Sequence, residues 1–232
     1  MNTCRICGYN EVHDFAIKDR KYGKCAKCKS ICTNPDSFAL PDVQKSRYEM
    51  HENSLKDAGY RGFLEGFIKP VLEELRKAEE SSGKTDVLPS RILDYGSGPE
   101  PALCELMKSF SEEGEYLPPG CDIRGWDPFF APATPFFENG ADLVTCLEVA
   151  EHFETPLKDM KKLAAAVRSG GYAAIGTMLL TEATSFPGWW YRSDITHVAF
   201  YTRDGLIQCA ESAGLSFVKA VTDRAFLFRK KD

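Results

Sequence analysis

Residues 92–101 read Ile-Leu-Asp-Tyr-Gly-Ser-Gly-Pro-Glu-Pro, and this stretch decides the fold. An apolar run ends at the acidic Asp94, and Gly96 and Gly98 follow in a turn that opens a helix. Glycine tolerates a positive φ and lets a ligand approach the backbone closely, which suits a ligand lying across the end of a strand. A tight turn that serves packing alone produces the same pattern, so the stretch by itself leaves both interpretations open.

Short apolar runs alternate with amphipathic stretches after residue 91. This alternation predicts an α/β domain whose mostly parallel sheet is covered by helices on both faces. The last two runs are separated by a short turn and therefore predict an antiparallel C-terminal hairpin. We expect strands at 91–95, 123–126, 141–147 and 172–178, helices at 101–111, 156–167 and 203–213, the hairpin at 215–221 and 225–228, and a truncated third strand between 128 and 140.

The N-terminal 35 residues contain two Cys-x-x-Cys pairs, Cys4 with Cys7 and Cys25 with Cys28, separated by 17 residues. Two tight turns at this spacing present four thiolates to one Zn²⁺, which predicts a small zinc-ribbon-like knuckle. Free thiols, a redox pair, or replacement of one ligand by Cys32 are the alternatives. A closed four-cysteine site folds a segment or presents a surface. We expect the remaining cysteines to be free thiols: Cys32, Cys104, Cys121, Cys146 and Cys209.

Between the knuckle and the α/β region, residues 36–46 are rich in turn-forming residues, and apolar residues recur at helical spacing over 59–80. Pro70 lies inside this pattern and predicts a kink, or a break between two shorter helices. Residues 81–86 are expected to form a linker. The predicted organisation is a knuckle at 1–35, a helical linker and lid at 36–90, and the main domain at 91–232.

The composition limits the classes of partner. The chain has 232 residues, is 43% hydrophobic and has a net charge of −5, so it can bury a full core but does not attract phosphate backbones overall. Nucleic acid is therefore disfavoured as a partner. No apolar stretch approaches the roughly 20 residues that span a bilayer, and the start has no signal-peptide core. We expect a cytoplasmic protein without membrane contact.

The stretch around the two glycines resembles the first motif of class I S-adenosylmethionine methyltransferases, and the resemblance covers residues 91–230. It implies a Rossmann-like, doubly wound fold with S-adenosylmethionine as the cofactor. The implied cofactor-binding residues are Asp94, Gly96, Ser97, Gly98, Asp127 for the ribose hydroxyls, and Glu148. Asp127 precedes Pro128, so its alternative role is that of a cap or turn residue. Glu100 stands where many members have a third glycine, and the missing glycine disfavours a nicotinamide-dependent oxidoreductase.

The end of the strand at 141–147 carries three polar residues, Glu148, Glu151 and His152. If a helical turn begins at Glu148, these side chains share one face. With His197 downstream, the segment resembles the Glu-x-x-Glu-His motif of metal-dependent O-methyltransferases, including small-RNA 3′-end and ubiquinone-biosynthesis enzymes. The resemblance implies a divalent cation held by all four residues, with Mg²⁺, Mn²⁺, Fe²⁺ and Zn²⁺ all compatible. A general-base role for one histidine and a structural role are the alternatives.

These observations predict an enzyme that methylates a hydroxyl group of a small molecule or of an RNA terminus, with Glu148, His152 and His197 as catalytic candidates. Residues 57–61 and the aromatic run 186–191 are expected to form a lid. The alternative is an inactive methyltransferase-like protein that uses its knuckle to bind a partner. The knuckle is also similar to that of sugar C-methyltransferases, so the acceptor atom stays open.

Overall fold

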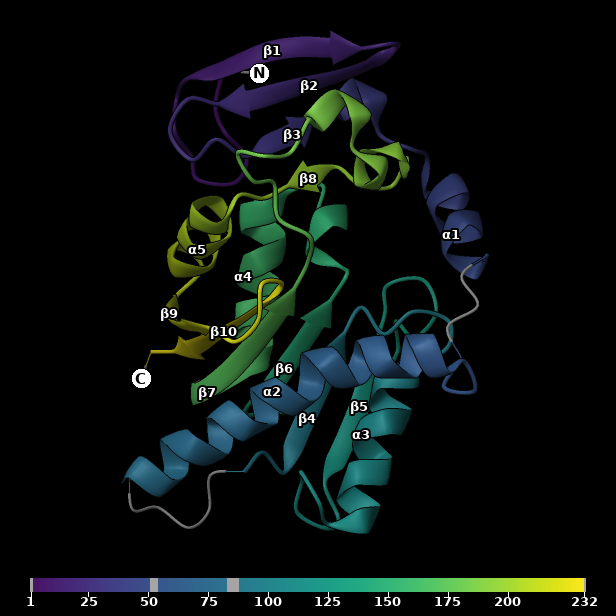
Figure 1. Cartoon of the computed structure of the whole chain (residues 1–232), viewed down its shortest axis with the longest axis vertical. Coiled ribbons are helices and arrows are strands. Elements are labelled where there is room, and N and C mark those ends of the chain that lie inside the picture. The colour runs from purple at the N-terminus through teal and green to yellow at the C-terminus, as the bar shows by residue number, and fades with distance from the viewer. Residues whose placement is uncertain (1, 51–53, 83–87, 232) are drawn as a thin grey trace.

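The computed structural model describes residues 2–50, 54–82 and 88–231 of the chain. Its main sheet has the strand order β5-β4-β6-β7-β10-β9 (Figure 1). The strands β4 to β7 are parallel, and β10 is antiparallel to both of its neighbours, β7 and β9. The strands are β4 (Arg91–Tyr95), β5 (Asp122–Trp126), β6 (Ala141–Leu147), β7 (Val167–Gly176), β9 (Leu215–Ala220) and β10 (Ala225–Lys230). This arrangement confirms the Rossmann-like α/β sheet and the antiparallel hairpin.

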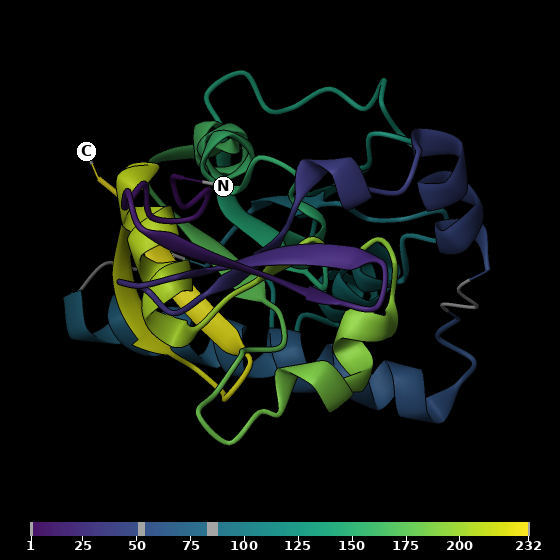
Figure 2. The same ribbon diagram turned by 90° about the horizontal axis from the view of Figure 1, so that it is seen from above.

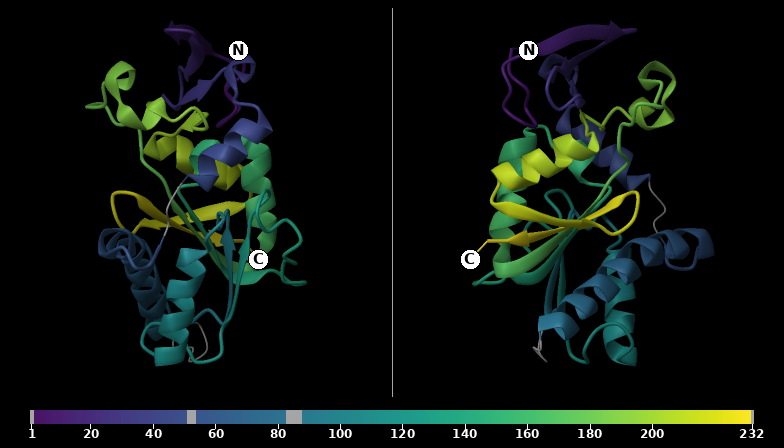
Figure 3. Two further views of the ribbon diagram at one scale, coloured as in Figure 1. Left: turned by 90° about the vertical axis from the view of Figure 1, so that its right-hand side faces the viewer. Right: turned by 60° about the vertical axis from the view of Figure 1, so that its left-hand side comes forward.

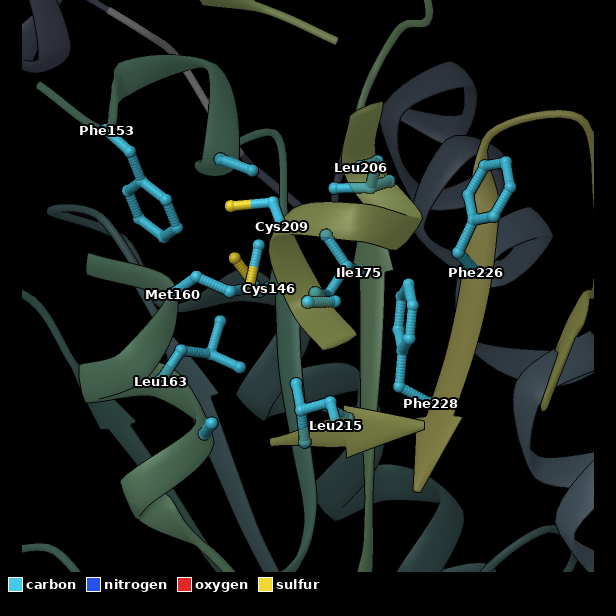
Figure 4. Close-up of a cluster of buried hydrophobic side chains, with 14 of the residues drawn as sticks. Cys146, Phe153, Met160, Leu163, Ile175, Leu206, Cys209, Leu215, Phe226 and Phe228 are labelled. Atoms are coloured by element: carbon cyan, nitrogen blue, oxygen red, sulfur yellow. The ribbon is translucent and has the colours of Figure 1, made fainter. Parts of the chain in front are cut away.

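Helices cover both faces of this sheet (Figure 3). One apolar cluster joins α2 (Ala58–Ser82) and α3 (Ala102–Glu113) to the sheet, and another joins α4 (Pro156–Ala166) and α5 (Arg203–Ser212) to the opposite face. Figure 4 shows the second cluster, in which Cys146, Met160 and Phe228 come from a strand of the sheet, from α4 and from β10. Within the described residues, no helix is long and apolar enough to cross a membrane.

A second sheet is built from the N-terminal segment and has the order β1-β2-β3-β8. Its strands are β1 (Val12–Ile17), β2 (Arg20–Cys25), β3 (Ile31–Thr33) and β8 (Ala199–Phe200). The fourth strand belongs to the main domain, because Ile31 pairs with Phe200 and Cys32 with Ala199. Seen from above, the β1–β2 hairpin lies across the carboxyl edge of the main sheet, beside the short helices η3 (Phe186–Gly188) and η4 (Trp190–Ser193) (Figure 2). The cysteine-rich segment is therefore joined to the main domain through a shared sheet.

Three elements differ from the sequence-based expectations. The helix α2 runs through Pro70 without interruption, so the predicted break is wrong. Burial of six apolar side chains on one face of α2 outweighs the roughly 3 kcal/mol cost of an internal proline. The strand β7 begins at Val167, before the predicted 172, and the turn-rich stretch after residue 36 contains η1 (Pro35–Ser37) and a helix, α1 (Pro41–Glu49).

The stretch 128–140, whose residues are all described, contains no strand beyond one isolated bridge between Asp127 and Ala131. This agrees with a truncated third strand. The linker predicted at 81–86 falls mostly on residues 83–87, which lie outside the described residues.

Candidate active site

A cavity of about 1080 Å³ opens at the carboxyl ends of β4, β5 and β6. Residues 94–96, 98–99 and 126–129 line one end, here called the glycine end, and the predicted Ser97 is not part of the lining. Residues 147–149, 151–155, 190–191, 193–194 and 197 line the other, here called the histidine end. Both segments predicted as a lid contribute to the lining, through Tyr60 and through Trp190 and Tyr191. The helix α1 contributes Arg47 and Tyr48, which the sequence analysis missed because this helix has almost no apolar face.

The glycine loop has the conformation that its residues suggest. Gly96 has a φ of 85° and Gly98 a φ of 70°, both in the left-handed region that favours glycine. A Cβ at Gly96 would lie 2.6 Å from Cγ2 of Val149, so the loop also passes too close to the turn after β6 for a side chain. Ser97 packs against Gly125, where a Cβ would lie 2.8 Å from Ser97 Oγ. The loop therefore offers bare backbone to a ligand at Gly96 and Gly98.

Two buried carboxyl groups support this loop. Asp94 accepts a hydrogen bond from Thr145 Oγ1 at 2.8 Å, and burial raises its pKa to about 6. Asp127 accepts from the backbone N–H groups of Gly98 at 3.1 Å and Phe129 at 2.8 Å. Asp127 thus joins the ends of β4 and β5, and this is the turn role that its position before Pro128 suggested. It also lines the cavity, as the predicted ribose contact requires.

Glu100 is exposed to solvent just before α3 begins. A carboxylate in that place does not occupy the loop interior. The cradle formed by Gly96 and Gly98 is therefore kept despite the absent third glycine.

The chain does not form the predicted α-helical turn at Glu148. Glu148 has a φ of 52°, and the turn that follows is the short 3-10 helix η2 (Ala150–His152). The expectation of one helical face at i, i+3 and i+4 is therefore wrong. The left-handed residue turns the chain sharply after β6, and Glu148, Glu151 and His152 still all line the cavity.

Two buried hydroxyl groups lie between the two glutamates. Tyr191 donates its hydroxyl proton to Glu148 Oε2 at 3.1 Å, and Thr177 donates to Glu151 Oε2 at 2.8 Å. The two hydroxyl oxygens lie 3.1 Å apart. Burial raises the pKa of both glutamates, and the charge of Glu151 adds to the shift of Glu148, as that of Asp194 adds to the shift of Glu151. Thr177 was not identified from the sequence, because a threonine at the end of a strand carries no distinctive signal.

Both histidines turn one nitrogen toward a backbone carbonyl. His197 Nδ1 lies 2.7 Å from the carbonyl oxygen of Tyr191, and His152 Nδ1 lies 3.1 Å from that of Thr196. A carbonyl oxygen only accepts, so Nδ1 carries the proton in each ring and Nε2 is left with a lone pair. Burial lowers the pKa of His152 to about 4 and that of His197 to about 3. Both rings are therefore neutral near pH 7.

Glu151, His152 and His197 come together as a candidate metal-ligand group whose ligand atoms lie within 4.8 Å of one another. His152 Nε2 is 4.0 Å from Glu151 Oε1, and the two imidazole centroids are 4.8 Å apart. Within the described part of the chain, Glu151 Oε1 is buried and has no hydrogen-bond partner. An unpaired buried carboxylate oxygen facing two imidazole lone pairs fits a cation. Glu148 lies outside this group of three, and its Oε1 is likewise buried and unpaired.

The four cysteines of the two pairs also come together within 4.8 Å. The sulfur atoms of Cys4 and Cys28 are 3.8 Å apart, and those of Cys7 and Cys25 are 3.6 Å apart. A tetrahedral ion with Zn–S bonds of about 2.3 Å requires S–S separations of about 3.8 Å, whereas a disulfide requires about 2.05 Å. The spacing therefore fits one zinc ion. All nine cysteines are unpaired thiols, as expected for the five outside the group, including the separately buried Cys32.

Comparison with known proteins identifies a family and similar folds for this chain. A family model described as "Methyltransferase domain" matches residues 60–220, and no curated protein matches. Among solved structures, the chain is similar to 1,6-didemethyltoxoflavin-N1-methyltransferase of Burkholderia thailandensis, with bound 1,6-didemethyltoxoflavin and S-adenosylhomocysteine. The TM-score is 0.52 and the identity 13%, over 96% of this chain and 100% of that chain.

An O-methyltransferase family protein of the same organism matches with a TM-score of 0.46 and 13% identity, over 82% of this chain and 63% of that one. The first of these structures, with a TM-score of 0.52, shows the fold, and the family model shows the relationship. The chain therefore belongs to the methyltransferase-domain family and is a methyltransferase.

Proposed function

We propose that this methyltransferase methylates a hydroxyl group of a small molecule with the help of a divalent cation at the histidine end. The observation that carries the proposal is the group formed by Glu151, His152 and His197, in which both Nδ1 atoms are engaged and Glu151 Oε1 is buried without a partner. Glu148, next to this group and with its own unpaired oxygen, is the proposed fourth ligand.

The histidine pKa values favour a cation over a general base. A base works best when its pKa lies near the working pH, and the pKa values of about 4 and about 3 lie far below neutrality. Neutral imidazole is the form that binds metal. A divalent cation in this place supplies charge that lowers the pKa of an acceptor hydroxyl. The residues around it hold the acceptor and exclude water.

The charges around the cavity favour a small molecule over an RNA terminus. Seven acidic side chains and three basic ones line it. The acidic ones are Asp94, Asp127, Glu148, Glu151, Glu154, Asp159 and Asp194, and the basic ones are Arg47, Lys162 and Arg224. Arg47 and Lys162 are already paired, with Asp194 and Asp159. A phosphodiester chain would therefore meet net negative charge and no free cluster of cations.

We propose that the glycine loop binds the methionine part of S-adenosylmethionine and that the end of β5 binds its ribose. The proposed contacts are Asp94, Gly96, Ser97, Gly98, Asp127 and Glu148. The positive φ of both glycines and the absence of room for a Cβ at Gly96 support this assignment.

The N-terminal segment is proposed to be a zinc-ribbon-like knuckle over residues 1–35. It precedes a helical linker and lid at 36–90 and the cofactor-binding domain at 91–232. The sulfur separations of 3.6 and 3.8 Å among the four cysteines support a structural zinc ion.

The test is calorimetric titration of S-adenosylmethionine into the protein, followed by measurement of S-adenosylhomocysteine release with Mg²⁺, Mn²⁺ or EDTA. The acceptors compared are a panel of phenols, catechols and aliphatic alcohols, and RNA oligonucleotides with a free 3′ hydroxyl. We expect cation-dependent turnover of a small hydroxyl compound. Equal turnover in EDTA would exclude metal assistance, and preferred methylation of RNA would overturn the acceptor class. Failure to bind the cofactor would leave the partner-binding alternative.

A further inference from the structure

Arg20 lies at the tip of the β1–β2 hairpin and points into the loop that carries His197. The two-residue turn between Ile17 and Arg20 contains Lys18 with a φ of 53°, so the hairpin closes tightly just before Arg20. Arg20 belongs to the cysteine-rich segment and is separated from His197 by 177 residues. The guanidinium nevertheless lies directly against the main domain.

The guanidinium of Arg20 donates hydrogen bonds to four backbone carbonyl groups within residues 192–197. Its Nη1 lies 3.2 Å from the carbonyl oxygen of Arg192 and 3.1 Å from that of Asp194. Its Nη2 lies 3.1 Å from the carbonyl oxygen of Ile195 and also donates to that of His197. One planar group with a fixed fork of donors thus sets the positions of four carbonyls, one in η4 and three in the irregular segment that follows it.

Further contacts of the N-terminal segment reach the same site. The N–H of Thr33 in β3 donates to the carbonyl of Val198 at 2.9 Å, and the N–H of Val198 donates to the carbonyl of Glu151 at 2.8 Å. Arg5, between Cys4 and Cys7, donates to the carbonyls of Glu154 and Thr33. The cysteine-rich segment therefore contacts both chain segments that supply the candidate metal ligands.

We infer that Arg20 is a positioning residue for His197, and that the cysteine-rich segment is a structural part of the active site and not a separate recruitment module. The inference rests on the proposed function in giving His197 a role in binding the cation. By holding the carbonyl of His197 and those of three residues that precede it, Arg20 fixes the backbone from which the imidazole projects toward Glu151 and His152.

The test compares Arg20→Ala and Arg20→Lys with a matched control, Arg76→Ala. Arg76 lies on α2 and donates to the carbonyl of Glu115 at 2.9 Å, an arginine–carbonyl contact outside the cavity lining. Mn²⁺ affinity is measured by electron paramagnetic resonance. Loss of groups that orient metal ligands lowers metal affinity by about 10–100-fold, and we expect this loss in Arg20→Ala. Lysine cannot span four carbonyls, so Arg20→Lys should recover only part of the affinity.

Two further readouts separate positioning from general destabilisation. S-adenosylmethionine affinity should remain at the wild-type level, because the glycine end makes no contact with Arg20 among the described hydrogen bonds. The imidazole N–H resonance of His197, hydrogen-bonded to Tyr191 in the wild type, should broaden or shift in Arg20→Ala and stay unchanged in Arg76→Ala.

The outcomes also distinguish the inference from the proposed function. If the wild type binds no Mn²⁺, the cation is excluded and the His197 resonance alone decides whether Arg20 positions the ring. If Arg20→Ala retains the wild-type Mn²⁺ affinity and His197 resonance, the inference is overturned. Equal losses of Mn²⁺ and S-adenosylmethionine affinity would indicate only a damaged fold, and would likewise overturn it.

Discussion

The two ends of the cavity are held together in different ways. At the glycine end, the supporting contacts lie within the main domain, such as that between Gly98 and Asp127, which are 29 residues apart, and that between Asp94 and Thr145, which are 51 residues apart. At the histidine end they are distant, for example Tyr48 with His152 across 104 residues and Arg20 with His197 across 177. Each end therefore depends on different parts of the chain. Disturbing the N-terminal segment should disable the histidine end and leave cofactor binding in place.

The largest expected effect follows from Cys28→Ser, which removes one of four sulfur ligands. Structural zinc sites contribute about 10–16 kcal/mol of binding free energy, so elemental analysis should show loss of the zinc ion. The N-terminal segment should then become sensitive to proteolysis, and Mn²⁺ binding at the histidine end should be lost. Calorimetry should still detect S-adenosylmethionine binding. Cys121→Ser, outside the group of four, is the matched control and should keep its zinc. Intact Mn²⁺ binding without zinc would show that the histidine end does not depend on the knuckle.

Glu151→Gln should impair catalysis at the histidine end and leave cofactor binding at the glycine end unchanged. The amide keeps the shape and the contact with Thr177 but removes the charge that faces the two histidines. A cation supplies several kcal/mol, so kcat/KM should fall by at least about 100-fold. Cofactor affinity and zinc content should not change. Glu182→Gln, at an exposed position, is the control. Activity within the range of that control would mean that Glu151 holds no catalytic cation.

Gly96→Ala should instead weaken cofactor binding at the glycine end. The new Cβ would lie 2.6 Å from Val149 Cγ2, at a φ of 85°, which corresponds to strain of about 1–3 kcal/mol and about a tenfold or greater loss of S-adenosylmethionine affinity. Adding Val149→Ala should recover the part that is due to the clash. Gly120→Ala is the control. Gly120 has a φ of 82°, and a Cβ there would have no neighbouring atom within 4 Å, so this variant should lose stability but keep its affinity for S-adenosylmethionine. Unaltered binding by Gly96→Ala in calorimetry would contradict the assigned cradle.

The last prediction concerns the pH dependence of stability and the histidine end alone. Folding lowers the pKa of His152 to about 4 and that of His197 to about 3, from an ordinary 6.5. The unfolded chain therefore binds protons that the folded state does not, and these residues reduce stability as pH falls below 6.5. Glu148 and Glu151, whose pKa values are raised, have the opposite effect and reduce stability as pH rises above their ordinary 4.5.

Relative to wild type, the double variant His152→Gln with His197→Gln should therefore gain stability as pH falls from 6.5 to 4. The gain is at most about 1.4 kcal/mol per pH unit for each histidine. Urea unfolding midpoints at several pH values, without added divalent cations, measure it. His13→Gln, at an exposed histidine of β1, should show no such trend. A double variant with the wild-type pH dependence would mean that the two rings are protonated as readily in the folded state as in the unfolded one.

The contrast between the two ends also explains what the sequence could predict. The strands 91–95 and 141–147 have the predicted bounds, because each is a short, mostly apolar run bounded by turn residues. The conformation of Gly96 and Gly98 follows from the same local pattern. The strands β1 to β3 were not predicted, because the cysteine group and the pairing with β8 stabilise them more than an apolar pattern of their own does.

At the histidine end, the residue types were predicted but the local geometry was not. The left-handed conformation of Glu148 is uncommon for a residue with a side chain, and no sequence pattern indicated it. Tyr48 and Arg20 are separated from their partners by 104 and 177 residues, and each lies in an element without a strong apolar periodicity. Such contacts depend on the tertiary arrangement.

The strand order has a consequence for anyone who trims this protein for expression or grafts it onto another. The family match ends at residue 220, yet β10 (Ala225–Lys230) lies between β7 and β9 in the sheet. A fragment ending at 220 would detach β9 and expose the edge of β7, and one beginning at 60 would remove the strand that pairs with β8. Bare strand edges promote aggregation. The smallest fragment that keeps both sheets paired runs from β1 through β10, which is almost the whole chain.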